Sequence, residues 1–538
     1  MEPENEVGNV EYKLKLTNKD IDRIENLTTQ MRYRCIEGEG ECIYNLGIED
    51  NGTITGITEK DYEETIKNIN IIADKNNYSV KILSATPVKD GKHIYEVLIR
   101  EINENKYIDI KVAIAGTVDA GKSSIVGCLI TGKNDNGRGF SRSFVFNYVH
   151  ELKSGRTSSI AHQILGFDYN GKAINIQGLN KLTWTDIIQR SSKVVSFFDL
   201  CGHEKYLSTT ILGLASSFPD ICMIIIDANN GIKPMTKEHI FLCITLKIPF
   251  IIVITKIDIC KDRQNILKET IQGINKFLRY PGIRRIPFHI KTQDDIIMCS
   301  KNIYADSITP IFQTSCVTNE GLDDIKTFLN ITPKKPLKNE KDIDIIEMHI
   351  DHVFNVHGFG IVVGGHLING TINVGDKLLV GPHSGSYETI IVRSIYCKKT
   401  PLQQVKHGSY VCLGIKKPDK INIKRGNVII SNKTEKLIVR EFTAEINILR
   451  THSTTVRVGY EPMFNGYSIR QVSKLVHIKN KKNARGDQII DDNDNILRNG
   501  DTALVVLKFK YHPEYLKIGT RFILSEGKCK IVGEVISN

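Results

Sequence analysis

The sequence lacks any hydrophobic run long enough to cross a membrane. Its longest candidate, Ile248 to Thr255, is bounded by Lys247 and Lys256, whereas a membrane-spanning helix needs about 18 or more apolar residues in a row. The first six residues are acidic and have no apolar core, so they do not resemble a signal peptide. We therefore expect a cytoplasmic protein that has no membrane partner.

Metal-thiolate motifs are missing as well. The 12 cysteines occur singly, with no CxxC pair and no Cys/His cluster at zinc spacing. In a chain without an export signal, such cysteines are expected to stay reduced. The excess of positive charge is moderate: 72 Lys and Arg against 61 Asp and Glu, or +11. That balance suits a polyanionic partner such as RNA but does not demand one.

The chain is too long for one domain, because 538 residues correspond to roughly three or four domains of about 150 residues. Patterning predicts a multidomain fold: a small α+β domain, an α/β domain with a mostly parallel sheet, and two β-barrels. The sheet is indicated by short apolar runs that alternate with helical stretches, and the barrels by alternating strands punctuated by glycine. We place the five segments at 1–107 (N-terminal), 108–331 (α/β), 332–343 (a linker rich in Pro and Lys), 344–435 (first barrel) and 436–538 (second barrel).

The N-terminal domain carries no catalytic motif, but its local pattern is informative. Apolar residues at helical spacing predict helices at 21–31 and 59–73, and strands are expected near 78–86 and 93–100. The turn signal at 50–52 (Asp-Asn-Gly) predicts a hairpin between strands at 42–46 and 53–57.

A phosphate-binding loop follows the first apolar run of the α/β domain. The segment from Gly116 to Ser123 matches GxxxxGK[ST], with a strand pattern before it and a helix pattern after it. Backbone N–H groups of such a loop wrap phosphates, and the helix N-terminus adds positive potential. We expect Lys122 to reach the β- and γ-phosphates and Ser123 to ligate Mg²⁺.

Three further motifs end later apolar strands. Asp199 begins a DxxGH motif, whose carboxylate can hold Mg²⁺ through water and whose Gly202 N–H can contact a γ-phosphate. In the TKID motif, Asp258 can accept two hydrogen bonds from guanine that adenine cannot supply, and Lys256 can cover the purine. The third motif, Thr-Ser-Cys at 314–316, could present backbone N–H groups to guanine O6.

In this order, the motifs resemble those of translation-factor GTPases, the relatives of elongation factor Tu and eukaryotic elongation factor one-alpha. A more specific resemblance is to the GTP-binding protein one/two subfamily. It rests on segments 137–140, 154–159, 165–168, 199–206 and 235–239, and extends into the N-terminal domain through 27–31 and 47–52. Members of that subfamily are cytoplasmic, monomeric GTPases linked to aminoacyl-tRNA delivery, ribosome rescue and mRNA turnover.

The resemblance implies roles for individual residues. His203 would orient the attacking water, and Thr157 of switch I would complete the Mg²⁺ shell formed with Ser123 and Asp199. Asp119 could also hold a monovalent cation near the phosphates. The expected GTP/GDP contacts are Gly116, Thr117, Val118, Asp119, Ala120, Gly121, Lys122, Ser123, Ser124, Asp199, Gly202, Thr255, Lys256, Asp258, Ser315 and Cys316.

Three residues depart from the pattern of elongation factor Tu. Thr255 replaces an Asn whose amide ties the guanine motif to the P-loop, so we expect guanine choice to survive through Asp258 but affinity to weaken. Ala120 replaces a His. Arg156 replaces an apolar residue that faces Val118. Our hypothesis is that Arg156 modulates the access of His203 to water or stabilises the charge that develops on the phosphate. The alternative is a solvent-exposed arginine without a catalytic role. Unchanged GTP hydrolysis in Arg156→Leu would contradict the catalytic version.

These expectations favour an elongation-factor-like GTPase that acts on aminoacyl-tRNA and the ribosome. One alternative is a GTP-gated adaptor that binds RNA and RNA-decay factors. Another is a GTP-binding switch without RNA, against which the two barrels and the positive charge argue.

Overall fold

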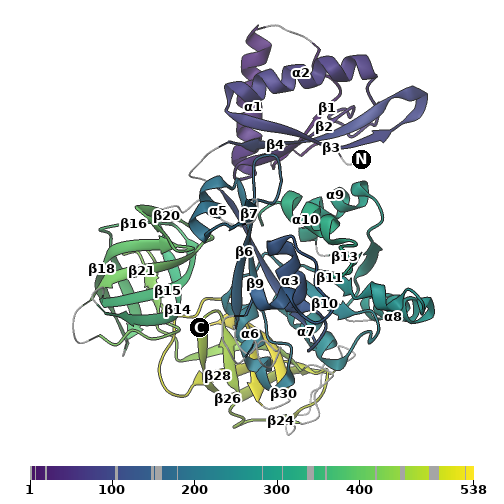
Figure 1. Ribbon diagram of the computed structural model, residues 1–538. Helices are drawn as coiled ribbons and strands as arrows, with labels where there is room; N and C mark the ends of the chain where they lie inside the picture. The colour runs from purple at the N-terminus through teal and green to yellow at the C-terminus, as the bar shows by residue number, and fades with distance from the viewer. Residues whose placement is uncertain are drawn as a thin grey trace.

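The computed structural model describes residues 3–5, 8–17, 21–102, 107–146, 151, 160–177, 180–280, 283–305, 307–335, 345–357, 360–383, 385–417, 421–448, 455–483, 496–526 and 529–538. The predicted fold class is confirmed. A small α/β unit lies at the top of Figure 1 and the P-loop domain lies in the middle, with the first barrel to its left and the second barrel below it. In the described part of the chain, no helix has the length and apolarity to cross a membrane.

The N-terminal unit is a four-stranded sheet in the order β1-β2-β4-β3. Two helices cover one of its faces (Figure 1), and their apolar sides form the core of the unit. The elements are β1 (Val10–Lys13), α1 (Ile21–Glu37), β2 (Glu41–Leu46), α2 (Glu59–Lys75), β3 (Tyr78–Pro87) and β4 (His93–Glu101).

The predicted helices and the strands near 78–86 and 93–100 are present, but the predicted hairpin is wrong. The chain does reverse at 50–52, where the Gly52 N–H donates to Glu49 O. Only Ile48 and Ile54 then form an antiparallel bridge. Strand β2 pairs instead with β1 and β4, because its six residues are all buried and a central position satisfies both of its edges.

The central domain is a seven-stranded sheet in the order β12-β13-β11-β10-β5-β9-β6, parallel except for β6. Its strands are β5 (Ile108–Gly116), β6 (Ala161–Phe167), β9 (Lys193–Asp199), β10 (Ile221–Asp227), β11 (Phe250–Thr255), β12 (Ile286–His289) and β13 (Ile308–Gln313). A short pair, β7 (Ile176–Gln177) and β8 (Asn180–Lys181), stands apart from this sheet.

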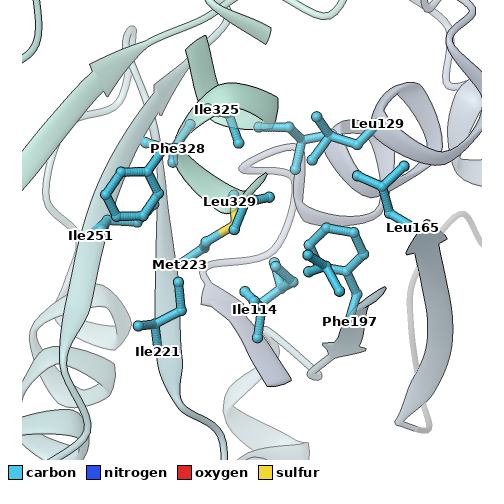
Figure 2. Close-up of a cluster of buried hydrophobic side chains, with 14 of the residues drawn as sticks. Ile114, Leu129, Leu165, Phe197, Ile221, Met223, Ile251, Ile325, Phe328 and Leu329 are labelled. Carbon is cyan, nitrogen blue, oxygen red and sulfur yellow. The ribbon is translucent and has the colours of Figure 1, made fainter. Parts of the chain in front are cut away.

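Helices cover both faces of the sheet. They are α3 (Lys122–Thr131), α5 (Trp184–Arg190), α6 (Leu207–Ser216), α7 (Pro234–Thr245), α8 (Gln264–Leu278), α9 (Gln293–Lys301) and α10 (Leu322–Ile331). Alternate residues of β5 point to opposite sides, so Val112 and Ile114 join one core while Ala113 and Ala115 join the other. Figure 2 shows the first core, in which Ile114 lies among side chains of the sheet and of α3 and α10. Strands buried on both faces explain the continuous apolar runs in the sequence.

The first barrel closes through six strands, since β17 pairs with both β22 and β18. Its strands are β14 (Glu347–Val356), β15 (Gly360–Asn369), β17 (Lys377–His383), β18 (Ser386–Cys397), β21 (Tyr410–Lys416) and β22 (Val428–Ile430), with β16 (Thr371–Asn373), β19 (Thr400–Leu402) and β20 (Gln404–Lys406) beside them.

The second barrel also closes through six strands. These are β23 (Glu441–Ile448), β25 (Met463–Gly466), β26 (Ile469–Lys482), β28 (Thr502–Phe509), β29 (Arg521–Glu526) and β30 (Cys529–Ser537), with the pair β24 (Val456–Arg457) and β27 (Ile496–Leu497) outside. The predicted domain boundaries stay predictions, although each sheet lies within one predicted segment.

A buried ionic cluster joins the N-terminal unit to the central domain. Glu41 Oε2 lies 2.8 Å from Arg100 Nη2, and Glu41 Oε1 lies 2.8 Å from Lys193 Nζ. Arg100 also donates to Asn330 O at 3.0 Å, and Lys193 to Thr332 O at 2.5 Å. Burial lowers the pKa of Lys193 to about 8, although Glu41 opposes the shift. Ion pairs that are buried away from water therefore hold the N-terminal unit against the central domain.

Replacing Arg100 by Met tests this docking. The variant leaves buried acceptors without a donor, so we expect the free energy of unfolding to fall by about 3 kcal/mol and the N-terminal unit to become sensitive to protease. Urea unfolding and limited proteolysis measure both. Lys15→Met is the control, because the Lys15–Asp61 pair is exposed and its loss should cost under about 1 kcal/mol. Equal losses in the two variants would contradict the interpretation.

Candidate nucleotide site

The four sequence motifs meet at one edge of the central sheet. Strands β9, β5, β10, β11 and β13 are neighbours and run parallel, so their carboxyl ends lie together. The P-loop leaves β5, the DxxGH segment leaves β9, TKID straddles the end of β11, and Thr-Ser-Cys follows β13. Residues far apart in sequence thus line one site.

Backbone geometry shapes the loop before α3. Gly116 has φ of 149°, and a Cβ there would lie 2.5 Å from Ile225 O, so only glycine allows the close approach to β10. Gly121, at the start of α3, has φ of 94°. The loop therefore passes beside β10 and delivers the N-terminus of α3 to the site.

Lys122 and Ser123 occupy the first turn of α3 and are both buried. Lys122 Nζ donates to Thr117 O at 2.9 Å, which folds the ammonium back over the loop. Burial lowers the pKa of Lys122, while nearby Asp199 opposes that shift. An ammonium held there is already oriented to bind phosphate oxygens, so little side-chain rearrangement is needed.

The Mg²⁺ prediction fits the oxygen atoms present. Ser123 Oγ donates to Asp199 Oδ2 at 2.5 Å, and Asp199 is fully buried at the end of β9. A hydroxyl and a carboxylate are hard donors, and Mg²⁺ is normally bound by one or two such groups together with phosphates and waters. Predicted switch residue Thr157 and predicted modulator Arg156 lie outside the described residues.

Gly202 packs directly on the P-loop. A Cβ at this position would lie 2.3 Å from Lys122 Nζ and 2.6 Å from Gly116 O. The DxxG segment therefore touches the phosphate loop through a residue that has no side chain.

His203 is exposed and caps the short helix at 204–206. Its Nδ1 accepts the Lys205 N–H at 3.1 Å. In the neutral ring this bond assigns the proton to Nε2, which is then a donor. His203 can therefore orient a water molecule or oxygen through Nε2–H.

The base-recognition side contains the expected Asp258, positioned by a contact that the sequence did not predict. Ser315 Oγ donates to Asp258 Oδ1 at 2.6 Å, while the Ser315 N–H donates to Glu320 O at 3.0 Å. Ser315 thus orients the carboxylate rather than offering its N–H. Within the described residues, the Cys316 N–H has no acceptor, so it stays available for a base oxygen.

Thr255, which stands where an Asn is usual, keeps a tie to the P-loop, and the weaker affinity expected from the missing amide stays a prediction. Thr255 Oγ1 donates to Ala120 O at 2.6 Å, so the hydroxyl holds the loop through one hydrogen bond. Ala120 is buried beneath it. A second tie comes from Lys256 Nζ, which donates to Asp119 O at 2.6 Å.

Sequence reasoning missed Asp227. Its Oδ2 lies 2.8 Å from Lys256 Nζ, and its Oδ1 accepts the Asn229 N–H at 2.8 Å. The pKa of Asp227 is lowered, because hydrogen bonds from Lys256 and Asn229 outweigh burial. A carboxylate at the end of β10, between two motif-bearing strands, was the available signal.

Replacing Asp227 by Asn tests whether this ion pair positions Lys256 over the base. We expect GDP to dissociate about tenfold faster, equivalent to about 1.4 kcal/mol, with kcat for GTP changed less than twofold. Stopped-flow release of a fluorescent GDP analogue measures the first quantity. Asp323→Asn, which removes an exposed pair with Lys326, is the control; an unchanged release rate in Asp227→Asn would reject the role.

Comparisons with known proteins agree with this geometry. Residues 109–354 match the family model of the elongation factor Tu GTP binding domain, and residues 360–430 match that of elongation factor Tu domain 2. The chain is 37% identical to GTP-binding protein 2 of Homo sapiens over 99% of this chain and 87% of that protein. It is also 37% identical to GTP-binding protein 1 of Xenopus laevis, over 98% of this chain and 78% of that one.

A solved structure supports the same fold. Translation elongation factor SelB from Methanococcus maripaludis, in complex with the GTP analogue GppNHp, matches with a TM-score of 0.54 and 20% identity. The match covers 80% of this chain and 79% of that one. At this identity the likeness concerns the arrangement of domains alone.

Proposed function

Because the chain belongs to the elongation factor Tu-type GTPases, together with GTP-binding proteins 1 and 2, we propose that it acts on aminoacyl-tRNA and the ribosome. Its membership of this family makes it an enzyme that binds and hydrolyses GTP. The observation that carries the proposal is the pair of closed barrels beside the GTPase domain. A GTPase that served only as a switch would not need them.

The site residues have defined roles in the proposed reaction, in which water attacks the γ-phosphorus and the bond to the β–γ bridging oxygen breaks. Lys122 and the N-terminus of α3 bind the phosphates. His203 orients the water through Nε2–H. Ser123 and Thr157, together with Asp199 through water, would hold Mg²⁺, which would supply positive charge to neutralise the phosphates. Asp258 and Cys316 select guanine.

An exposed aromatic platform on the first barrel supports contact with RNA or an aminoacyl group. Phe354 is 46% exposed and stacks on His352 with ring centroids 5.8 Å apart. Exposed, stacked rings are a common way to bind unpaired bases.

Multiple-turnover GTP hydrolysis with and without ribosomes tests the proposal. We expect strong stimulation by ribosomes that is lost in His203→Ala, while GTP affinity is retained. Absence of stimulation in a protein that binds GTP tightly would reject a role on the ribosome. Protection of the aminoacyl ester bond in the presence of GTP then distinguishes delivery of aminoacyl-tRNA from the alternative, a GTP-gated RNA-decay adaptor, which would bind deacylated RNA without protecting an ester.

A further inference from the structure

A cavity of about 410 Å³ lies where three parts of the protein meet. The central domain contributes the end of α6 and the residues after it, including Ala215 and Phe218. The first barrel contributes Leu367, and the second barrel contributes Tyr467. This volume falls in the range of small-molecule sites, and the cavity is separate from the nucleotide site described above.

One wall of the cavity is aromatic and apolar. Phe218 and Tyr467, from different domains, stack with ring centroids 5.1 Å apart and planes 22° apart. Phe218 has φ of 45°, a left-handed conformation that is unusual for a bulky residue and more so before a proline. Strained residues of this kind persist where the surroundings hold them, and they cluster at ligand sites.

The other wall carries an excess of positive charge. Lys111 is 6% exposed, and its Nζ lies 3.1 Å from His366 Nδ1. Within the described residues neither Lys111 nor Lys335 forms an ion pair. Burial lowers the pKa of Lys111, and the carboxylates of Asp220 and Asp109 oppose that shift only in part. Among the described residues, the hydrogen-bond partner of this buried ammonium is an imidazole. Such burial is costly, and an anion in the cavity would relieve the cost.

The remaining charges of the cavity largely balance. Lys334 pairs with Glu39 at 2.5 Å, and Arg521 pairs with Glu534 at 2.7 Å. Asp220 lines the cavity, but its Oδ2 already accepts the Lys111 N–H at 2.8 Å. The lining therefore contains two lysines that form no ion pair with any described residue, Lys111 and Lys335, and one carboxylate, Asp220, so its net charge is positive.

We propose that this cavity binds a small organic anion with an aromatic or aliphatic body, its charge toward Lys111 and Lys335 and its body against Phe218 and Tyr467. Because all three domains line the site, the ligand binds only when the barrels are docked as described. A change of this docking between the GTP-bound and GDP-bound protein would therefore change the affinity for the ligand, and the coupling would be reciprocal.

A pair of matched fluorescent probes tests the ligand class on the full-length protein. 8-Anilinonaphthalene-1-sulfonate has an aromatic body and one negative charge, and N-phenyl-1-naphthylamine is its neutral counterpart. We expect saturable binding of one sulfonate per chain, at least tenfold tighter than binding of the neutral probe. Equal affinities for the two probes would overturn the proposed anion specificity.

Two variants place the probe. Ala215→Phe fills the cavity and should abolish binding of the sulfonate. Lys335→Glu is an exposed substitution that should fold normally and weaken binding about tenfold, whereas Lys268→Glu on α8 should have no effect. Retained affinity in Lys335→Glu would overturn the assignment even if Ala215→Phe failed to fold. Coupling predicts that the affinity for the sulfonate differs between the GDP-bound and GTP-analogue-bound protein, and identical affinities would overturn that part.

Discussion

Replacing Asp258 by Asn should change the nucleotide that the protein binds. The carboxylate can accept hydrogen bonds from both guanine N1–H and N2–H, whereas an amide offers one acceptor and one donor. Its N–H would then face the N2–H of guanine, so we expect GTP affinity to fall about a thousandfold, or about 4 kcal/mol. Xanthine has an oxygen at position 2, which accepts from the amide, so affinity for XTP should rise.

The structure indicates that Asn can take the place of Asp258 in the same orientation. Ser315 Oγ donates to Asp258 Oδ1 at 2.6 Å, and the same hydroxyl can donate to the amide oxygen of Asn, which leaves the amide N–H for the base. Equilibrium binding of fluorescent GTP and XTP analogues measures the switch. Asp262→Asn, in the exposed turn that follows, is the matched control and should bind GTP normally. A variant that lost GTP without gaining XTP would mean that Asp258 supports the loop rather than reading the base.

The architecture could be predicted because its signals are local. Apolar runs such as Phe250–Thr255 are buried on both faces, and that burial leaves a pattern in the sequence that alternating strands do not have. The P-loop could also be predicted from the sequence. Its motif requires glycine at positions 116 and 121, because other residues rarely adopt the backbone conformations found there.

Contacts between distant segments could not be predicted in the same way. Asp227 pairs with Lys256 because β10 and β11 are neighbours in register. Glu41 meets Lys193 across two domains. A turn signal such as 50–52 specifies a reversal of the chain but not which strands pair, and β2 found better partners elsewhere. Thr255 shows the same limit. The sequence shows that the usual amide is absent, but not that the hydroxyl donates to Ala120 O, because that hydrogen bond depends on the three-dimensional path of the loop.

Replacing Gly202 by Ala should separate GTP binding from GTP hydrolysis. The added Cβ would lie 2.3 Å from Lys122 Nζ, 2.6 Å from Gly116 O and 2.8 Å from Thr117 C. The lysine end could move, but the two backbone atoms cannot, so the DxxG segment must withdraw from the phosphate loop. Withdrawal moves His203, the next residue, away from the water that it orients. Mispositioning of a catalytic group by about 1 Å commonly costs a hundredfold, and we expect a loss of that size in kcat. GDP affinity should change only a few-fold, because Asp258 and Lys256 lie on other strands.

Single-turnover hydrolysis and equilibrium GDP binding measure the two effects. Gly273→Ala in α8, where a Cβ meets no atom within 4 Å, is the control and should leave both unchanged. A normal hydrolysis rate in Gly202→Ala would show that the segment can leave the P-loop without losing catalysis, and would remove the geometric argument for His203.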